Sequence, residues 1–261
     1  MKTSATGRTA LVTGASSGLG VAFARELARR GWSLILVARS EAPMQQLARE
    51  LRATGVDVHV RTADLAVAAA REQLIGGLAA DGIVVDALVN NAGFGLFGHF
   101  SETDWARLDN MLAVDVVALT HLTHLVLPGM RERGFGRVLQ VASTGAFQPT
   151  PTYAAYSAAK SYVLEFSYAI DRELRSSGVR CTVVSPGVTA TRFLEVSGQR
   201  ATWYQRLTRM EAPAVATRGI DAMLAGRGGV VVGWVNAVMA HSTRLMPRAV
   251  SARVAGWLMR N

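Results

Sequence analysis

Short runs of β-branched and other apolar residues alternate along the chain with longer segments whose apolar positions recur at helical spacing. The strand-like runs cover residues 8–14, 32–39, 56–65, 85–93, 136–143, 179–187 and 228–234. Helices are expected over residues 18–30, 42–54, 67–80 and 153–177, with a long helical region ending near residue 133. Near-continuous apolar strands separated by helices are typical of a parallel sheet that is buried on both faces. The pattern therefore predicts an α/β fold over residues 1–261, a single doubly wound Rossmann-like domain with about seven strands.

The last part of the chain, residues 192–261, is expected to hold a variable substrate loop followed by two basic amphipathic helices. Apolar residues recur there at helical spacing, with arginines between them: Val235, Val238, Met239, Leu245 and Met246, then Val250, Val254, Trp257 and Leu258 after Pro247, with Arg248, Arg253 and Arg260 interspersed. Such helices can pack on their own domain or on a second subunit, or lie on an anionic membrane. We favour packing, in a homodimer or homotetramer, and keep peripheral membrane contact as the alternative.

Composition narrows the class of protein. The chain has 261 residues, of which 50% are hydrophobic and 18% charged, which indicates a globular protein. Cys181 is the only cysteine, so an intrachain disulfide is excluded and a reducing compartment is favoured. No apolar signal region precedes the first strand, and residues 228–240 are too short to span a bilayer. We predict a cytoplasmic location, peripheral to the membrane if the C-terminal helices bind there.

The net charge of +9 lies mostly in the C-terminal part, where residues 200–261 carry nine arginines against Glu211 and Asp221. A nucleic-acid partner would require a basic surface interleaved with aromatic residues or a known binding motif. Neither is present in the sequence, so nucleic acid is not an expected partner. His121 and His124 have no Glu or Cys at zincin spacing, so no metal site is predicted.

The first strand-like run leads into the sequence TGASSGLG, whose glycines are Gly14, Gly18 and Gly20. A turn of this kind lets backbone N–H groups and a helix N-terminus approach a pyrophosphate. The turn therefore predicts a dinucleotide site, to which Ser16, Ser17 and Leu19 also belong. The same letters match the nucleophile elbow of hydrolases, with Ser16 as nucleophile. Only thirteen residues precede Gly14, too few for the strands and oxyanion loop which that fold requires.

The ends of the next three strands carry further candidate cofactor residues. Arg39 and Ser40 end the second strand, where an acidic side chain would hold the ribose of NAD and an arginine accommodates the phosphate of NADP. We therefore predict NADP(H) as the cofactor. Asp64 and Leu65 at the third strand are placed to contact the adenine. Small residues in the sequence NNAG let the fourth strand pack against the cofactor, through Asn91, Ala92 and Gly93.

The fifth strand ends at Ser143, and the helix after it carries Tyr156 and Lys160. Lys160 is one of only two lysines, the other being Lys2, among 28 Lys and Arg residues. Residues at i and i+4 share a helix face, so the phenol and the ammonium point the same way. A nearby cation lowers the pKa of a tyrosine, which suits Tyr156 to general acid/base chemistry. With Ser143 holding the oxygen, the three side chains predict reduction of a carbonyl.

In order along the chain, TGASSGLG, NNAG, Ser143, YSAAK and SPG resemble the short-chain dehydrogenases/reductases, over nearly all of the chain up to Val188. The resemblance implies that Lys160 also binds the nicotinamide ribose. It further implies that Pro186, Gly187 and Val188 line the nicotinamide, and that Thr191 meets the pyrophosphate or the carboxamide. Asp115 stands where many members have an asparagine that holds a relay water. We expect Asp115→Asn to keep reductase activity and to shift its pH optimum.

The predicted function is NADP(H)-dependent reduction of a ketone or aldehyde, or the reverse oxidation of the alcohol. The expected partner is a small, apolar carbonyl or alcohol substrate, because apolar residues flank the predicted cleft. A non-catalytic NADP(H) sensor of the same fold is the alternative. A nucleotide-sugar epimerase or dehydratase would need a larger C-terminal domain than this chain has.

Overall fold

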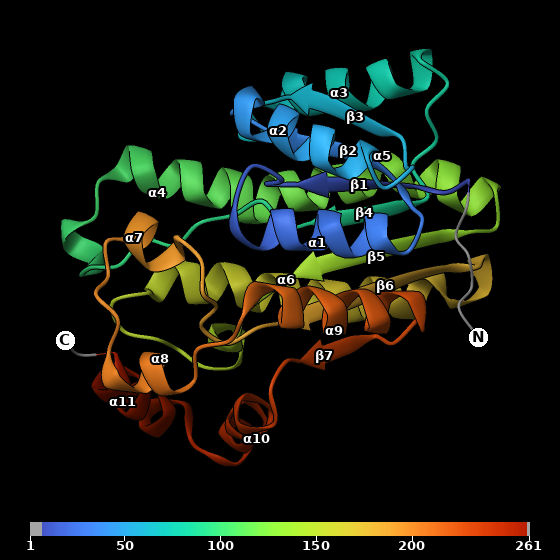
Figure 1. Ribbon diagram of the computed structural model, residues 1–261. Helices are drawn as coiled ribbons and strands as arrows, with labels where there is room; N and C mark the ends of the chain where they lie inside the picture. The colour runs from blue at the N-terminus through green and yellow to red at the C-terminus, as the bar shows by residue number, and fades with distance from the viewer. Residues whose placement is uncertain (1–6, 260–261) are drawn as a thin grey trace.

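The computed structural model describes residues 7–259, and Lys2 and Arg260 lie outside the described residues. Seven parallel strands form one sheet in the order β3-β2-β1-β4-β5-β6-β7. The strands are β1 (Thr9–Thr13), β2 (Ser33–Ala38), β3 (Val58–Thr62), β4 (Ala87–Asn90), β5 (Gly136–Val141), β6 (Val179–Ser185) and β7 (Gly229–Val231). The predicted doubly wound α/β fold with seven strands is confirmed (Figure 1).

Helices connect the strands and continue past the last one. They are α1 (Gly18–Arg29), α2 (Glu41–Arg52), α3 (Ala68–Ala80), α4 (Trp105–Leu112), α5 (Leu119–Glu132), α6 (Ala154–Leu174), α7 (Phe193–Ser197), α8 (Trp203–Leu207), α9 (Ala212–Leu224), α10 (Trp234–Ser242) and α11 (Arg248–Leu258). Shorter turns of 3-10 helix are η1 (Phe100–Glu102), η3 (Thr144–Phe147), η4 (Arg175–Ser177) and η5 (Thr243–Leu245).

The two faces of the sheet carry separate apolar cores. On one face, α1, α2 and α9 pack their apolar stripes on the strands, with Phe23, Met44 and Ile220 fully buried. On the other face α3, α5 and α6 do the same, and Leu78 and Met130 are almost fully buried there (Figure 1). Burial on both sides explains why the strands read as continuous apolar runs rather than as alternating patterns.

The order of the strands reverses next to β1. From β1 the chain moves outward through β2 and β3, and it then returns to place β4 on the other side of β1. Helices on opposite faces of the sheet leave a crevice at this point, beyond the carboxyl ends of the strands. The topology therefore places the predicted ligand-binding residues of β1, β2 and β4 next to one another.

The long helical region predicted after β4 is interrupted. Between α4 and α5 the chain forms a π-helical segment, η2 (Ala113–Ala118), which contains Asp115. Such π segments inside α-helices are frequent at functional sites. Here the π-helical segment contains Asp115, whose carboxylate is fully buried, at 0% exposure.

Counted through the π-helical segment, the helical stretch Trp105–Glu132 is 28 residues long and has a mean hydropathy of 1.6 over its most apolar window, enough by length and composition to cross a bilayer. Its inner face, however, carries polar groups bonded to the sheet. The amide of Asn90 on β4 donates to Thr123 Oγ1 at 3.0 Å, and Gln140 on β5 donates to the same hydroxyl at 2.9 Å. These buried hydrogen bonds indicate a core helix of the fold.

Candidate active site

A cavity of about 580 Å³ lies beyond the carboxyl ends of β1, β2, β4, β5 and β6. Its volume is in the range of about 300–1,000 Å³ that is usual for small-molecule and cofactor sites. Most residues predicted from the sequence line it: Gly14, Ser16, Ser17, Gly18, Leu19, Arg39, Ser40, Asp64, Leu65, Asn91, Ala92, Gly93, Ser143, Tyr156, Lys160, Pro186, Gly187, Val188 and Thr191. Gly20 and Asp115 are the two predicted residues that lie outside the lining, and both support it from behind.

The glycine turn after β1 is shaped by backbone conformation and close packing. Gly14 and Gly18 have φ angles of +68° and +56°, in the left-handed region that favours glycine. A Cβ on Gly20 would lie 2.1 Å from the carbonyl oxygen of Gly14, so only glycine lets α1 begin this close to the turn. Ser17 occupies the N-cap position of α1 without a side-chain cap, and no acidic residue lies in the first turn of this helix. The first N–H groups of α1 are therefore placed to receive an anion.

Thr13, which the sequence reasoning missed, ties this turn to the end of β4. Its buried hydroxyl accepts hydrogen bonds from the backbone N–H groups of Asn91 and Ala92, both at 2.9 Å, and donates to the Val89 carbonyl. The Asn91 amide in turn donates to the Thr13 carbonyl at 2.9 Å. The sequence held one signal for this role. Thr13 is the residue just before the glycine turn, so its hydroxyl lies where β1 and β4 end side by side.

The ends of β2 and β3 form the far wall of the cavity. Arg39 and Ser40 are exposed, and Arg39 makes no ion pair with the other described residues. Asp64 is exposed as well and accepts a hydrogen bond from the backbone N–H of Ala66, while Leu65 is buried. A guanidinium with no ion-pair partner among the described residues therefore stands beside the cavity, at the end of β2.

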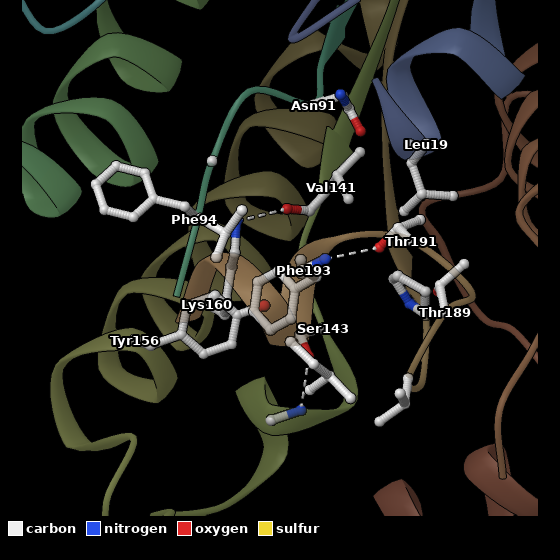
Figure 2. Close-up of a pocket in the computed structure, with 18 of the residues that line it drawn as sticks. Leu19, Asn91, Phe94, Val141, Ser143, Tyr156, Lys160, Thr189, Thr191 and Phe193 are labelled. Atoms are coloured by element: carbon white, nitrogen blue, oxygen red, sulfur yellow. Dashed lines mark hydrogen bonds between the residues drawn. The ribbon is translucent and has the colours of Figure 1, made fainter. Parts of the chain in front are cut away.

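The segment after β6 packs on both the glycine turn and the C-terminal part. The side chain of Thr191 lies against Gly18, where a Cβ would approach it to 3.3 Å. Thr191 Oγ1 accepts from the backbone N–H of Phe193 at 3.2 Å (Figure 2). Thr189, two residues earlier, also lines the cavity. Thr189 was not predicted from the sequence, although it lies between the predicted residues Val188 and Thr191.

Ser143, Tyr156 and Lys160 gather on one wall of the cavity (Figure 2). Ser143 caps η3 by accepting from the backbone N–H of Gly145 at 3.1 Å, which holds its hydroxyl in place. Lys160 is 5% exposed, donates to the carbonyl of Val141 at 3.1 Å, and has its Nζ 5.7 Å from the centroid of the Tyr156 ring. The strand end and the helix thus bring the three side chains together as predicted.

Asp115 lies behind Lys160 rather than on the cavity surface. Its Oδ2 lies 3.0 Å from Lys160 Nζ, in an ion pair whose alignment falls short of a hydrogen bond, and its Oδ1 accepts from the backbone N–H of Phe94 at 3.0 Å. A Cβ on Gly93 would lie 2.8 Å from Oδ1, so the carboxylate packs directly under the segment after β4. Burial raises the pKa of Asp115, although Lys160 and the Phe94 N–H act in the opposite direction.

The predicted lowering of the Tyr156 pKa is wrong for this structure. Burial raises the pKa of Tyr156 well above its usual value, the Asp115 carboxylate raises it further, and the Ser143 hydroxyl offsets part of the rise. Burial is the main physical reason, and the ion pair adds to it, because the charge of Lys160 is balanced by Asp115 at 3.0 Å. The phenol therefore faces a nearly neutral pair instead of an isolated cation.

Aromatic and aliphatic side chains enclose the rest of the cavity. The ring of Tyr156 lies 5.3 Å from that of Phe193 and 5.6 Å from that of Tyr153, centroid to centroid. Met239 on α10 and Leu258 on α11 also line the cavity, and both come from segments far away in the sequence. Sequence reasoning did not assign these two residues to the site, because nothing local marks which face of a C-terminal helix turns inward.

The residues fit a dinucleotide. The glycine turn leaves a cradle that a Cβ at Gly14 or Gly20 would fill, and Arg39 offers a free cation at the far end. Within residues 7–259, by contrast, no group of three or more His, Cys, Asp or Glu side chains is arranged to hold a metal ion. A Rossmann sheet with this cradle and a tyrosine–lysine pair facing it defines the class, an oxidoreductase with a dinucleotide site.

Comparison with known proteins gives the family. The family model for short chain dehydrogenases matches residues 8–201. The very-long-chain 3-oxoacyl-CoA reductase of Anas platyrhynchos is 32% identical over 91% of this chain and 77% of its own length. Sulfoacetaldehyde reductase 2 of Chromohalobacter salexigens is 36% identical over 79% of this chain and 84% of its own. A short-chain dehydrogenase from Sphingobium yanoikuyae, solved with NADPH, superposes with a TM-score of 0.81 at 29% identity, covering 92% of this chain and 95% of that one. The chain belongs to the short-chain dehydrogenase family.

Proposed function

We propose that this protein is an NADP(H)-dependent reductase of apolar ketones or aldehydes that also catalyses the reverse oxidation. The observation that carries the proposal is the grouping of Ser143, Tyr156 and Lys160 on the wall of a cavity that continues to the glycine turn. The similarity to two reductases and to an NADPH-bound dehydrogenase supports the reaction class.

The cofactor would be held along the strand ends. Backbone N–H groups at Gly18 and Leu19 would bind the pyrophosphate, Arg39 and Ser40 the ribose phosphate, and Asp64 and Leu65 the adenine. Residues 91–93 of the segment NNAG and residues 186–188 after β6 would flank the nicotinamide half of the cofactor. Thr191 would contact the pyrophosphate or the carboxamide. When bound, the reduced nicotinamide supplies the hydride for the carbonyl carbon.

The protein's own groups would handle the oxygen and the proton. Ser143 donates a hydrogen bond to the carbonyl oxygen and so holds it beside Tyr156. Tyr156 then donates its phenolic proton to that oxygen as negative charge develops on it, and the alcohol results. The phenol is protonated at neutral pH and can therefore donate, although burial raises its pKa and so makes it a weaker acid than an exposed tyrosine. Lys160 binds the ribose and, with Asp115 behind it, sets the charge that the phenol faces.

The preference for NADP(H) is a separate part of the proposal. A guanidinium forms charge-assisted hydrogen bonds to a phosphate that it cannot form to a ribose hydroxyl. Loss of such a bond costs about 1.5–3 kcal/mol, so Arg39→Ser should lower the ratio of kcat/KM for NADPH over NADH roughly ten- to a hundredfold. Arg49→Ser, an exposed arginine on α2 outside the cavity, is the matched control.

The experiment is a cofactor-oxidation assay with NADPH and NADH across a panel of apolar and polar carbonyl compounds. Turnover with NADPH should be abolished by Tyr156→Phe and strongly reduced by Ser143→Ala. Tyr162→Phe removes a phenol from the same helix outside the cavity and should leave the rate unchanged. Equal rates with NADH would refute the NADP(H) preference. Binding of NADPH without turnover of any carbonyl compound would refute the enzyme and favour the NADP(H) sensor.

We also propose that residues 1–261 act as one cofactor-binding domain and assemble as a homodimer or homotetramer. An apolar and aromatic surface on η2 and α6 supports assembly: Val117 is exposed, and Tyr162 stacks on Phe166 with centroids 5.5 Å apart. Light scattering of the purified chain would give the mass in solution. A monomer at micromolar concentration would refute the assembly.

A further inference from the structure

The last two helices turn their apolar sides outward. On α11, Val250, Val254 and Trp257 share one face at i, i+4 and i+7, and all three are exposed, while the inner face buries Ser251 and Ala255. A helix that packs only on its own domain buries its largest apolar residues. This helix instead leaves Trp257 60% exposed and buries a serine.

Helix α10 has the same inverted arrangement. Trp234 and Val238 lie one turn apart and are 79% and 62% exposed, whereas Asn236 and Ala240 are buried. The buried asparagine is satisfied locally, because its Nδ2 donates to the Val232 carbonyl at 3.1 Å. The face of α10 that carries Asn236 and Ala240 therefore packs inward, and this leaves Trp234 on the outer face.

Helices α8, α10 and α11 lie near one another at one end of the molecule (Figure 1). The indoles of Trp203 on α8 and Trp257 on α11 meet edge to face, 6.1 Å apart between centroids. The Tyr204 hydroxyl on α8 donates to Met239 Sδ on α10 at 3.5 Å. We call the exposed residues Trp203, Leu207, Trp234, Val238, Val254 and Trp257 the tryptophan surface. It holds three of the chain's five tryptophans.

The two segments that carry this surface hold charge of one sign. Residues 201–210 and 233–259 contain five arginines and no aspartate or glutamate: Arg206, Arg209, Arg244, Arg248 and Arg253. All five are exposed. A second copy docked through this face about a two-fold axis would bring the arginines of these segments against one another, and the segments themselves supply no carboxylate to pair them. The charge therefore disfavours self-association here and calls for an anionic partner.

We propose that the tryptophan surface docks on the surface of an anionic lipid bilayer. Indole rings favour the boundary between headgroups and acyl chains, and arginines around them pair with lipid phosphates. Helices α10 and α11 lie parallel to the bilayer with their apolar faces down and do not cross it. On their other side Met239 and Leu258 line the active-site cavity, so the docked membrane lies beside the part of the cavity that would receive an apolar substrate.

Flotation of the full chain with lipid vesicles tests the proposal. At low salt the protein should float with vesicles of equal parts phosphatidylcholine and phosphatidylglycerol, and much less with phosphatidylcholine alone. Tryptophan emission should shift to shorter wavelength on binding. The double variant Arg248→Gln/Arg253→Gln should bind about thirtyfold more weakly, from the usual contribution of each arginine near an anionic surface.

A second variant separates apolar insertion from charge. Trp234→Ser/Trp257→Ser should lose vesicle binding and keep the unfolding temperature of the parent, because both side chains are exposed. The matched control is Trp105→Ser on α4, 68% exposed but outside the tryptophan surface, which should bind as the parent does. Failure of the parent to bind anionic vesicles would overturn the proposal. So would an equal loss in the Trp105 variant, or a parent dimer that the Trp234/Trp257 variant converts to a monomer.

Discussion

Replacing Asp115 with asparagine removes a negative charge next to the proposed acid/base without changing the size of the side chain. The asparagine oxygen can still accept from the Phe94 N–H, and the uncharged amide nitrogen then takes the place of Oδ2 beside Lys160. Two effects on Tyr156 then act in the same direction. The carboxylate no longer raises the pKa of the phenol, and the charge of Lys160 is no longer balanced. The pKa of Tyr156 must fall.

Two distances set the size of this fall. Lys160 Nζ lies 5.7 Å from the centroid of the Tyr156 ring and 3.0 Å from the Asp115 carboxylate, so the carboxylate lies at most about 8.7 Å from the ring. With an effective dielectric constant of about 20, a unit charge at that distance contributes about 1.9 kcal/mol, or about 1.4 pKa units. Water in the adjoining cavity screens part of this interaction. We expect a shift of about one pH unit.

The assay is the pH profile of kcat/KM in both directions. In oxidation Tyr156 must accept a proton, so the rate rises with pH through its pKa, and the variant should rise about one unit earlier. In reduction Tyr156 must donate a proton, so the rate falls as the pH rises through its pKa. This fall should also occur about one pH unit lower in the variant. Asp171→Asn is the matched control, because it removes a different buried carboxylate, which pairs with Arg180 and lies about 22 Å from Tyr156 along α6. An unmoved or upward-shifted profile in Asp115→Asn, or an equal shift in the control, would refute the reasoning.

Three further substitutions test the architecture around the cavity. Gly20→Ala puts a Cβ 2.1 Å from the Gly14 carbonyl, so we expect a loss of about 2 kcal/mol in urea unfolding and weaker NADPH binding by titration. Thr13→Val leaves two backbone N–H groups without their acceptor and should cost about 2 kcal/mol or more, with NADPH affinity reduced. Tyr153→Phe removes the hydrogen bonds to Ser197 and Gln199 and should cost about 1 kcal/mol, raising KM for the carbonyl substrate more than it lowers kcat. Unchanged midpoints of urea unfolding, together with unchanged NADPH affinities and KM values, would contradict the contacts described for these residues.

Much of the site could be predicted because its chemistry is local in the sequence. A glycine turn between a strand and a helix has few ways to fold, and a tyrosine four residues before a lysine shares its helix face. Parallel strands then align their carboxyl ends, so Arg39, Asp64 and Ser143 had to reach the same edge of the sheet. These predictions needed only the periodicity of the elements and the rules of strand connection.

What the sequence could not supply came from contacts between distant segments. The pairing of Asp115 with Lys160 joins residues 45 positions apart through a π-helical turn, and it acts together with the burial of Tyr156, the larger cause, to reverse the expected direction of the Tyr156 pKa shift. Likewise, the spacing of Val250, Val254 and Trp257 predicted an amphipathic helix but not which way it faces. Local backbone preferences determined the elements and the order of the reacting groups. Only the tertiary packing decided which charges meet and which apolar faces remain outside, because burial and Coulomb energy depend on neighbours that the local sequence does not specify.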